Sequence, residues 1–163
     1  MLLAALLHEL GHLVTLTVFG CRVHIKLTPA GMIIEKEGAT FSYMTDAVIF
    51  ASGPLMNILT FALLRGAQSS ILSLLSSVSL VLALINLLPV KGLDGWGLLF
   101  SFLSLFFDHT AALRISEAAS LIFTASVFIL SLVLMLEAEP NFSLFALYSW
   151  LFYNNYIKIQ KFR

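Results

Sequence analysis

Long apolar segments separated by short polar breaks dominate the pattern of this chain. A helix needs about 17–25 mostly apolar residues to cross a bilayer, and the first segment, about 28 Å long as a helix, is just sufficient. The predicted spans are Met1–Phe19, Phe41–Leu64, Ile71–Leu88 and Ala118–Leu136. Leu98–Phe107 is too short to span and is expected to be re-entrant or interfacial. The shorter, aromatic-rich segment Phe142–Ile157 is suited to a membrane interface and would be a fifth crossing.

Between the first two predicted spans the pattern changes from continuous to alternating. Polar and apolar residues alternate strictly from Arg22 to Leu27, which predicts a strand with one solvated face. Thr28–Gly31 is typical of a turn, and Met32–Glu37 of a return strand. A β-hairpin is therefore expected after the first helix. The second span is interrupted by Ser52-Gly53-Pro54, which is expected to kink it or loosen its hydrogen bonding.

Composition supports a membrane protein. Hydrophobic residues make up 60% of the 163 and charged residues 11%, compared with about 25% charged in soluble domains. We expect an all-α polytopic membrane protein, residues 1–163 forming one domain, with about four to five transmembrane helices, the short β-hairpin and the re-entrant or interfacial segment. The formal net charge is zero, and no basic patch indicates nucleic acid. With one cysteine, Cys21, no intrachain disulfide can form, and no removable signal peptide is expected.

The first apolar segment contains the sequence His8-Glu9-Leu10-Gly11-His12. Residues four apart lie on one helix face, so His8 and His12 can offer ring nitrogens to one metal ion. Glu9 is offset around the helix and can reach a water on the metal without binding the ion itself. This H-E-x-x-H pattern is typical of zinc hydrolases, in which two histidines and a third ligand hold Zn²⁺. An acidic residue within such an apolar span also indicates a functional partner.

Topology identifies the third ligand. If the first helix ends on one side of the bilayer, the third helix returns to that side and delivers Asp94 there, at a depth similar to that of His12. Asp94 is therefore the predicted third ligand, the alternative being an Asx residue that stabilises a turn. The same side collects eight basic residues and the other side one, Arg65, so it is predicted to be cytoplasmic. The eight are Arg22, Lys26, Lys36, Lys91, Arg114, Lys158, Lys161 and Arg163.

Four other polar residues have competing interpretations. Asn57 and Asn86 are candidates to hydrogen-bond a substrate backbone or oxyanion, and could equally join helices to one another. His24 is expected to be a solvated strand residue, and His109 to lie at the interface.

Three motifs in this order resemble the site-2 protease family of intramembrane zinc metalloproteases, in particular its sporulation-type branch. They are His8-Glu9-Leu10-Gly11-His12, Gly53-Pro54-Leu55-Met56-Asn57, and Asn86-Leu87-Leu88-Pro89 leading to Leu93-Asp94-Gly95. The hairpin and the aromatic, basic C-terminal end belong to the likeness, which covers most of the chain.

The resemblance implies one zinc ion held by His8, His12 and Asp94, with Glu9 as general base. It implies membrane-embedded or membrane-tethered protein substrates cut near the cytoplasmic face, in the sporulation branch a sigma-factor precursor, and inhibitory membrane proteins as further partners. The chain departs from the family in three ways. Trp96 follows the Leu-Asp-Gly motif where glycine is usual, and we expect the family's leading helix before the first motif and its C-terminal nucleotide-sensing domain to be absent.

Two other classes of function remain as alternatives. A metal transporter would need polar residues along a path across the bilayer, and the segment Ala118–Leu136 offers none. A catalytically inactive relative that binds a membrane partner would be favoured by loss of Glu9 or of a ligand, and all of these residues are present.

Overall fold

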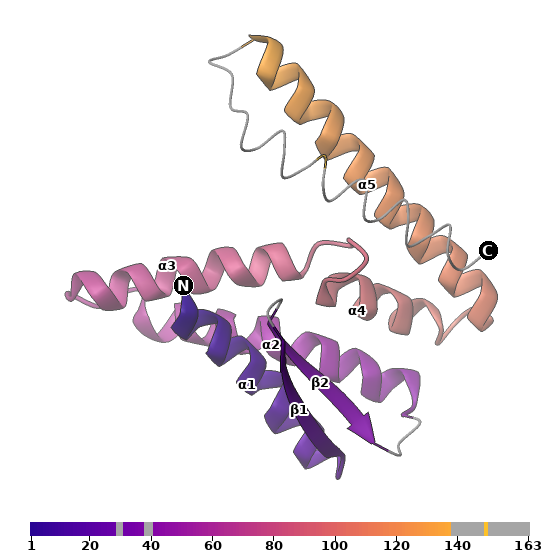
Figure 1. The fold of residues 1–163 in the computed structure, drawn as a ribbon, viewed down its shortest axis with the longest axis horizontal. Coiled ribbons are helices and arrows are strands. Elements are labelled where there is room, and N and C mark those ends of the chain that lie inside the picture. The colour runs from indigo at the N-terminus through magenta and orange to yellow at the C-terminus, as the bar shows by residue number, and fades with distance from the viewer. Residues whose placement is uncertain (29–30, 38–40, 138–148, 150–163) are drawn as a thin grey trace.

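The computed structural model describes residues 1–28, 31–37, 41–137 and 149. The predicted segment Phe142–Ile157 lies almost wholly outside these residues. Within them the chain forms five helices and one two-stranded sheet (Figure 1). The helices are α1 (Leu2–Val18), α2 (Tyr43–Leu64), α3 (Ser70–Asn86), α4 (Asp94–Leu103) and α5 (His109–Glu137). The first three lie within two residues of their predicted bounds, because each is a mainly apolar run that ends at clear breaks.

The last two helices begin earlier than predicted. Glycines on either side of Asp94 predict a glycine-flanked turn at this position, but Asp94 is the first residue of α4, so that prediction is wrong. A side-chain carboxylate is favourable at a helix N-terminus, where backbone N–H groups lack partners. Helix α5 begins at His109, although its apolar run was predicted only from Ala118. The carboxylate of Asp108 accepts hydrogen bonds from the backbone N–H groups of Thr110 and Ala111, at 3.0 and 3.1 Å, and so caps this start.

Helix α2 is the centre of the described fold, because it packs against α1, α3 and α4. It runs as one helix through Ser52-Gly53-Pro54, with Pro54 buried inside it. Helices α1 and α2 pack at very close range. A Cβ on Gly11 would lie 2.5 Å from the carbonyl oxygen of Ser52, so only glycine allows this approach.

A β-hairpin follows α1 (Figure 1). Strands β1 (Arg22–Thr28) and β2 (Gly31–Glu37) pair antiparallel, with Arg22 opposite Glu37 at one end and Thr28 opposite Gly31 at the other. The chain leaves α1 through Gly20, whose φ of +74° is a conformation that glycine adopts without strain. The hairpin is thereby set beside α1, with which β1 is in contact.

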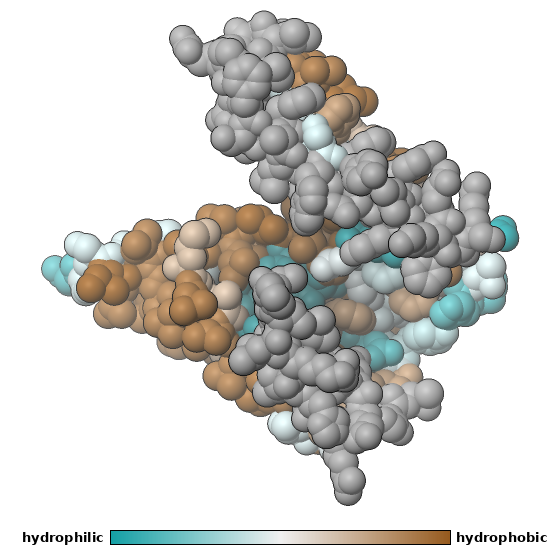
Figure 2. Space-filling model, viewed as in Figure 1, coloured by the Kyte–Doolittle hydropathy of each residue, from teal (hydrophilic) through white to brown (hydrophobic). Residues whose placement is uncertain are grey.

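The surface of the described helices is apolar and the interior contains many polar residues. Figure 2 shows hydrophobic residues gathered over the α1 and α3 part of this face, with hydrophilic residues in a hollow at its centre. On α1 the exposed large side chains are Leu2, Leu3, Leu6, Leu10, Val14 and Val18. The buried polar set includes His8, His12, Asn57, Ser76, Ser79, Ser101, Ser116 and Ser120. This distribution is the reverse of that in a water-soluble protein and is typical of helices packed within lipid.

Two of the described helices are long and apolar enough to cross a membrane by length and composition, namely α2 and residues His109–Val133 of α5. Helices α1 and α3 are also apolar but shorter, at 17 residues each. That length is at the lower limit for spanning the hydrocarbon core. The prediction of about four to five transmembrane helices is therefore supported directly for two.

Candidate metal centre

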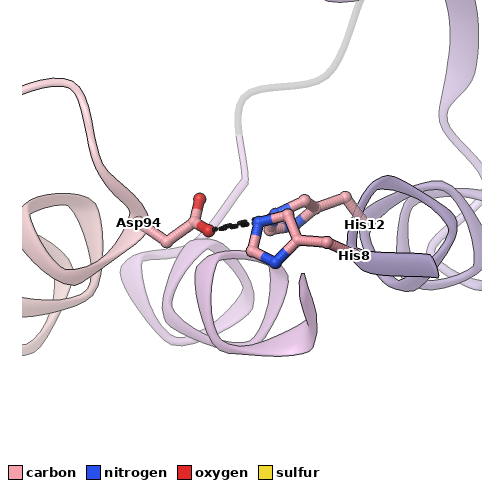
Figure 3. A group of neighbouring side chains, drawn as sticks. All are labelled: His8, His12 and Asp94. Carbon is pink, nitrogen blue, oxygen red and sulfur yellow. Dashed lines mark hydrogen bonds and ion pairs between the residues drawn. The ribbon is translucent and has the colours of Figure 1, made fainter. Parts of the chain in front are cut away.

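Two helices that are far apart in sequence bring three metal-ligand side chains together (Figure 3). His8 and His12 project from adjacent turns of α1, and both are buried. Asp94 projects toward them from the first turn of α4 and is half-buried. The prediction that Asp94 meets His8 and His12 is thus matched by the geometry.

The separations between the potential ligand atoms suit a small metal ion. Nε2 of His8 lies 2.9 Å from Oδ2 of Asp94. Nε2 of His12 lies 3.3 Å from the same oxygen and 3.3 Å from Nε2 of His8. Ligand atoms about 2.0–2.1 Å from a tetrahedral zinc ion are about 3.3 Å apart, so these three atoms fit around one ion. Two imidazoles and a carboxylate are also a usual donor set for catalytic zinc.

Helix α2 fixes the ring of His12. Nδ1 of His12 lies 2.8 Å from the backbone carbonyl oxygen of Ile49 and donates its hydrogen to it. The Ser52 hydroxyl donates to the same carbonyl at 2.6 Å and lies 3.3 Å from Nδ1. A ring that donates from Nδ1 leaves Nε2 free to bind a metal. His12 is therefore oriented as a ligand by the backbone of α2.

The ring of His8 meets α2 through a side chain. Nδ1 of His8 lies 3.2 Å from Nδ2 of Asn57, and Asn57 is fully buried. Gly53 lies on α2 between Ile49, which contacts His12, and Asn57, which contacts His8. A Cβ at position 53 would come within 2.3 Å of Nε2 of His12 and 2.8 Å of Cε1 of His8. The imidazole rings thus occupy the space that any side chain at position 53 would need.

The loop that carries Asp94 is attached to α5. Nζ of Lys91 lies 2.6 Å from Oε1 of Glu117, and both side chains are largely buried. The backbone N–H of Lys91 donates to the hydroxyl of Ser120 at 2.8 Å. Nζ also lies 5.5 Å from the centre of the Trp96 ring, a cation–π contact. These contacts hold the segment between α3 and α4 in place, and with it the position of Asp94.

The other predicted residues lie in different surroundings. Glu9 is half-buried on α1, beside His8 in the sequence. Nδ2 of Asn86 donates to the Leu82 carbonyl of its own helix at 3.0 Å, and among the described residues Asn86 makes no hydrogen bond to the three ligands. The predicted substrate contacts of Asn57 and Asn86 stay predictions. His109 contacts the Tyr43 hydroxyl, at 3.2 Å, away from the cluster, and the side chain of His24 lies outside the description.

Sequence reasoning missed the contributions of Ile49, Ser52 and Gly53 to the site. From its residues Ser52-Gly53-Pro54 is predicted only to break the helix, and Gly53 otherwise enters through the motif Gly53-Pro54-Leu55-Met56-Asn57 that carries the family resemblance. One signal was available: Gly53 and Asn57 are four residues apart and therefore share a helix face. The backbone contact of Ile49 has no signature in the sequence, since every residue has a carbonyl.

Comparison with known proteins supports the predicted family. The family model described as Peptidase family M50 matches residues 63–130, a stretch that includes Asp94. Stage IV sporulation protein FB of Bacillus subtilis (strain 168) is 32% identical over 131 residues. That alignment covers 76% of this chain and 46% of the relative, so the chain spans about half the length of the curated relative it matches.

A solved structure shares the fold. The site-2 protease from Methanocaldococcus jannaschii superimposes with a TM-score of 0.69, covering 94% of this chain and 73% of that one. Sequence identity is 21%, so this likeness concerns the fold. The family model and the curated relative support the family predicted from the three motifs, the site-2 protease family of M50 peptidases, and the solved structure shares the fold.

Proposed function

We propose that this chain is an intramembrane zinc metalloendopeptidase that cuts protein substrates embedded in, or tethered to, the membrane. One observation carries the proposal. Two buried histidines and a carboxylate converge with ligand-atom separations of 2.9–3.3 Å inside a set of helices with an apolar surface. Buried ionisable groups in such surroundings are costly and are retained for function. The similarity to Peptidase family M50 supports the same reaction class.

His8, His12 and Asp94 would hold the ion. When bound, zinc supplies an acidified water and polarises the scissile carbonyl. Glu9 follows the first ligand directly on α1 and is not one of the three converging residues. Its carboxylate takes the proton of the attacking water and passes it to the leaving amine, as a general base and then a general acid.

The substrate is expected to be an unwound membrane segment cut near the cytoplasmic face. The hairpin supports this, because β1 and β2 are paired only with each other among the described strands and an extended segment could add to an outer edge. The resemblance of the motifs to the sporulation branch suggests a membrane-tethered sigma-factor precursor as the substrate class, and the similarity to a stage IV sporulation protein agrees with that branch. Inhibitory membrane proteins would be further partners.

Glu9→Gln tests the proposed reaction. The variant should lose cleavage of a membrane-tethered sigma-factor precursor co-produced in a bacterial host, because glutamine cannot take the proton. Its zinc content should equal that of the unmodified chain, since residue 9 is not a ligand. Cleavage by the variant, or loss of its zinc, would refute the role given to Glu9.

A further inference from the structure

Only one of the two polar atoms of the buried Asn57 amide has a hydrogen-bond partner among the described residues. Its Nδ2 lies 3.2 Å from Nδ1 of His8, whereas its Oδ1 has no hydrogen-bond partner among the described residues. The side chain is 0% exposed. Buried polar atoms nearly always have a partner, so an orphaned amide oxygen at a ligand's ring calls for an explanation.

The position of the hydrogen on the His8 ring explains why the amide nitrogen of Asn57, and not its oxygen, faces Nδ1. Oδ2 of Asp94 lies 2.9 Å from Nε2 of His8, and a carboxylate can only accept. In the metal-free neutral ring the hydrogen therefore sits on Nε2, and Nδ1 accepts from the amide nitrogen of Asn57. A metal ion bound to Nε2 would change Nδ1 from a hydrogen-bond acceptor into a donor. The hydrogen of the neutral ring must then be on Nδ1, which becomes a donor and would face the amide's own donor.

We infer that Asn57 is a positioning residue that serves both forms of His8. Its amide nitrogen donates to the metal-free ring, and after a turn of about 180° its amide oxygen accepts from the metal-bound ring. The inference rests on the proposed function in one respect, which is that the ion binds through Nε2. An amide suits both forms because it has a donor and an acceptor at almost the same distance from the chain.

His12 shows the contrast. Its Nδ1 faces the Ile49 carbonyl oxygen at 2.8 Å, and a carbonyl accepts in either state. Nε2 of His12 lies further from Oδ2 of Asp94, at 3.3 Å, than Nε2 of His8 does, at 2.9 Å, so the hydrogen of the neutral His12 ring is placed on Nδ1 with or without metal. His12 is the preformed ligand of the pair, and His8 is the ligand that changes on metal binding.

Zinc affinity tests the inference in the full chain. Affinities measured by competition with a chelator are compared for the unmodified chain, Asn57→Leu, Asn57→Asp and the control Thr60→Val. Thr60 lies one turn further along α2, is buried, and donates only to its own helix. Asn57→Leu removes both partners and should bind zinc about 10–100-fold more weakly. Asn57→Asp keeps the acceptor and should bind at least as tightly as the unmodified chain, and Thr60→Val should not change the affinity.

An Asn57→Asp variant that bound as weakly as Asn57→Leu, or an Asn57→Leu variant that bound normally, would overturn the inference. If the unmodified chain itself bound no zinc, the proposed function would fail and this inference with it. Circular dichroism of each variant establishes that the helices are formed.

Nitrogen-15 spectra of the histidine rings give a second readout that is independent of affinity. In the unmodified chain the hydrogen of the His8 ring should move from Nε2 to Nδ1 when zinc is added, whereas that of His12 should stay on Nδ1. In metal-free Asn57→Asp it should already be on Nδ1 of His8. A His8 ring that carries its hydrogen on Nδ1 in both states of the unmodified chain would contradict the exchange.

Discussion

At the scale of single residues, glycine and backbone atoms of α2 shape the site as much as the ligands do. Gly11 lets the backbones of α1 and α2 touch, and Gly53 leaves room for the rings of His8 and His12. The carbonyl oxygen of Ile49 fixes one of those rings. The two histidine ligands are thus held by contacts between two adjacent helices, which restrict the rings before any ion binds.

Gly53→Ala tests this arrangement. The added Cβ would lie 2.3 Å from Nε2 of His12, so the ring has to move from the position in which it faces Asp94. We expect zinc affinity to fall by more than about tenfold. Gly66→Ala is the matched control, because nothing lies within 4 Å of a Cβ at that position. Equal zinc affinity in the two variants would show that Gly53 does not shape the site.

At the scale of elements, local patterns predicted most of the fold and long-range contacts decided the rest. The spacing of His8 and His12 is a local property of a helix, and Asp94 followed from counting membrane crossings. The early start of α4 could not be predicted in this way. A Cβ on Gly95 would meet the Leu87 carbonyl oxygen at 2.2 Å, and one on Gly97 would meet the Phe50 ring at 2.5 Å. These glycines serve close packing, whereas in the sequence they resemble a break.

The contact between Asn57 and His8 could not be predicted from the sequence either, because long-range packing between helices decides it. It joins residues 49 positions apart and depends on how closely α1 packs on α2. Two readings of Asn57, as substrate contact or as a residue that joins helices, were both compatible with its sequence position. The early start of α5 differs, because the Asp108 cap is a local signal that was overlooked.

The hairpin belongs to this scale, and Ile25→Pro tests its role in handling substrate. Ile25 lies in the middle of β1, opposite Ile34. Proline removes one backbone N–H and disrupts pairing along that strand. Cleavage of a tethered substrate should fall sharply while zinc content is retained, because the ligands are on α1 and α4. Undiminished cleavage by a folded variant would argue against strand addition and for binding between helices.

At the scale of the whole molecule, the membrane serves as the solvent for the apolar surface. Large apolar side chains are exposed on the described helices, and serine, asparagine and histidine are buried between them. The hydrophobic effect cannot hold such helices together within lipid, so close packing and hydrogen bonds between them must do so. The contact between the Ser76 hydroxyl and the Phe61 carbonyl oxygen, at 3.2 Å, is one such bond between α2 and α3.

The proposed orientation predicts which positions face the cytoplasm. Cysteine is introduced singly at Asp108, before α5, or at Gly66, after α2, in a Cys21→Ser background. A membrane-impermeant maleimide should label Gly66→Cys in intact cells and Asp108→Cys only in inverted vesicles, because most of the basic residues are assigned to the side of Asp108. The opposite pattern would reverse the orientation.

The central claim is that His8, His12 and Asp94 together hold one zinc ion, and zinc content of the purified chain tests it most directly. Elemental analysis compares the unmodified chain with Asp94→Ala and with the control Asp108→Ala, whose carboxylate caps α5 and is not one of the three converging groups. The account predicts about one zinc per chain in the unmodified protein and in Asp108→Ala, and loss of most of it in Asp94→Ala. Equal zinc in all three proteins, or none in the unmodified one, would contradict it.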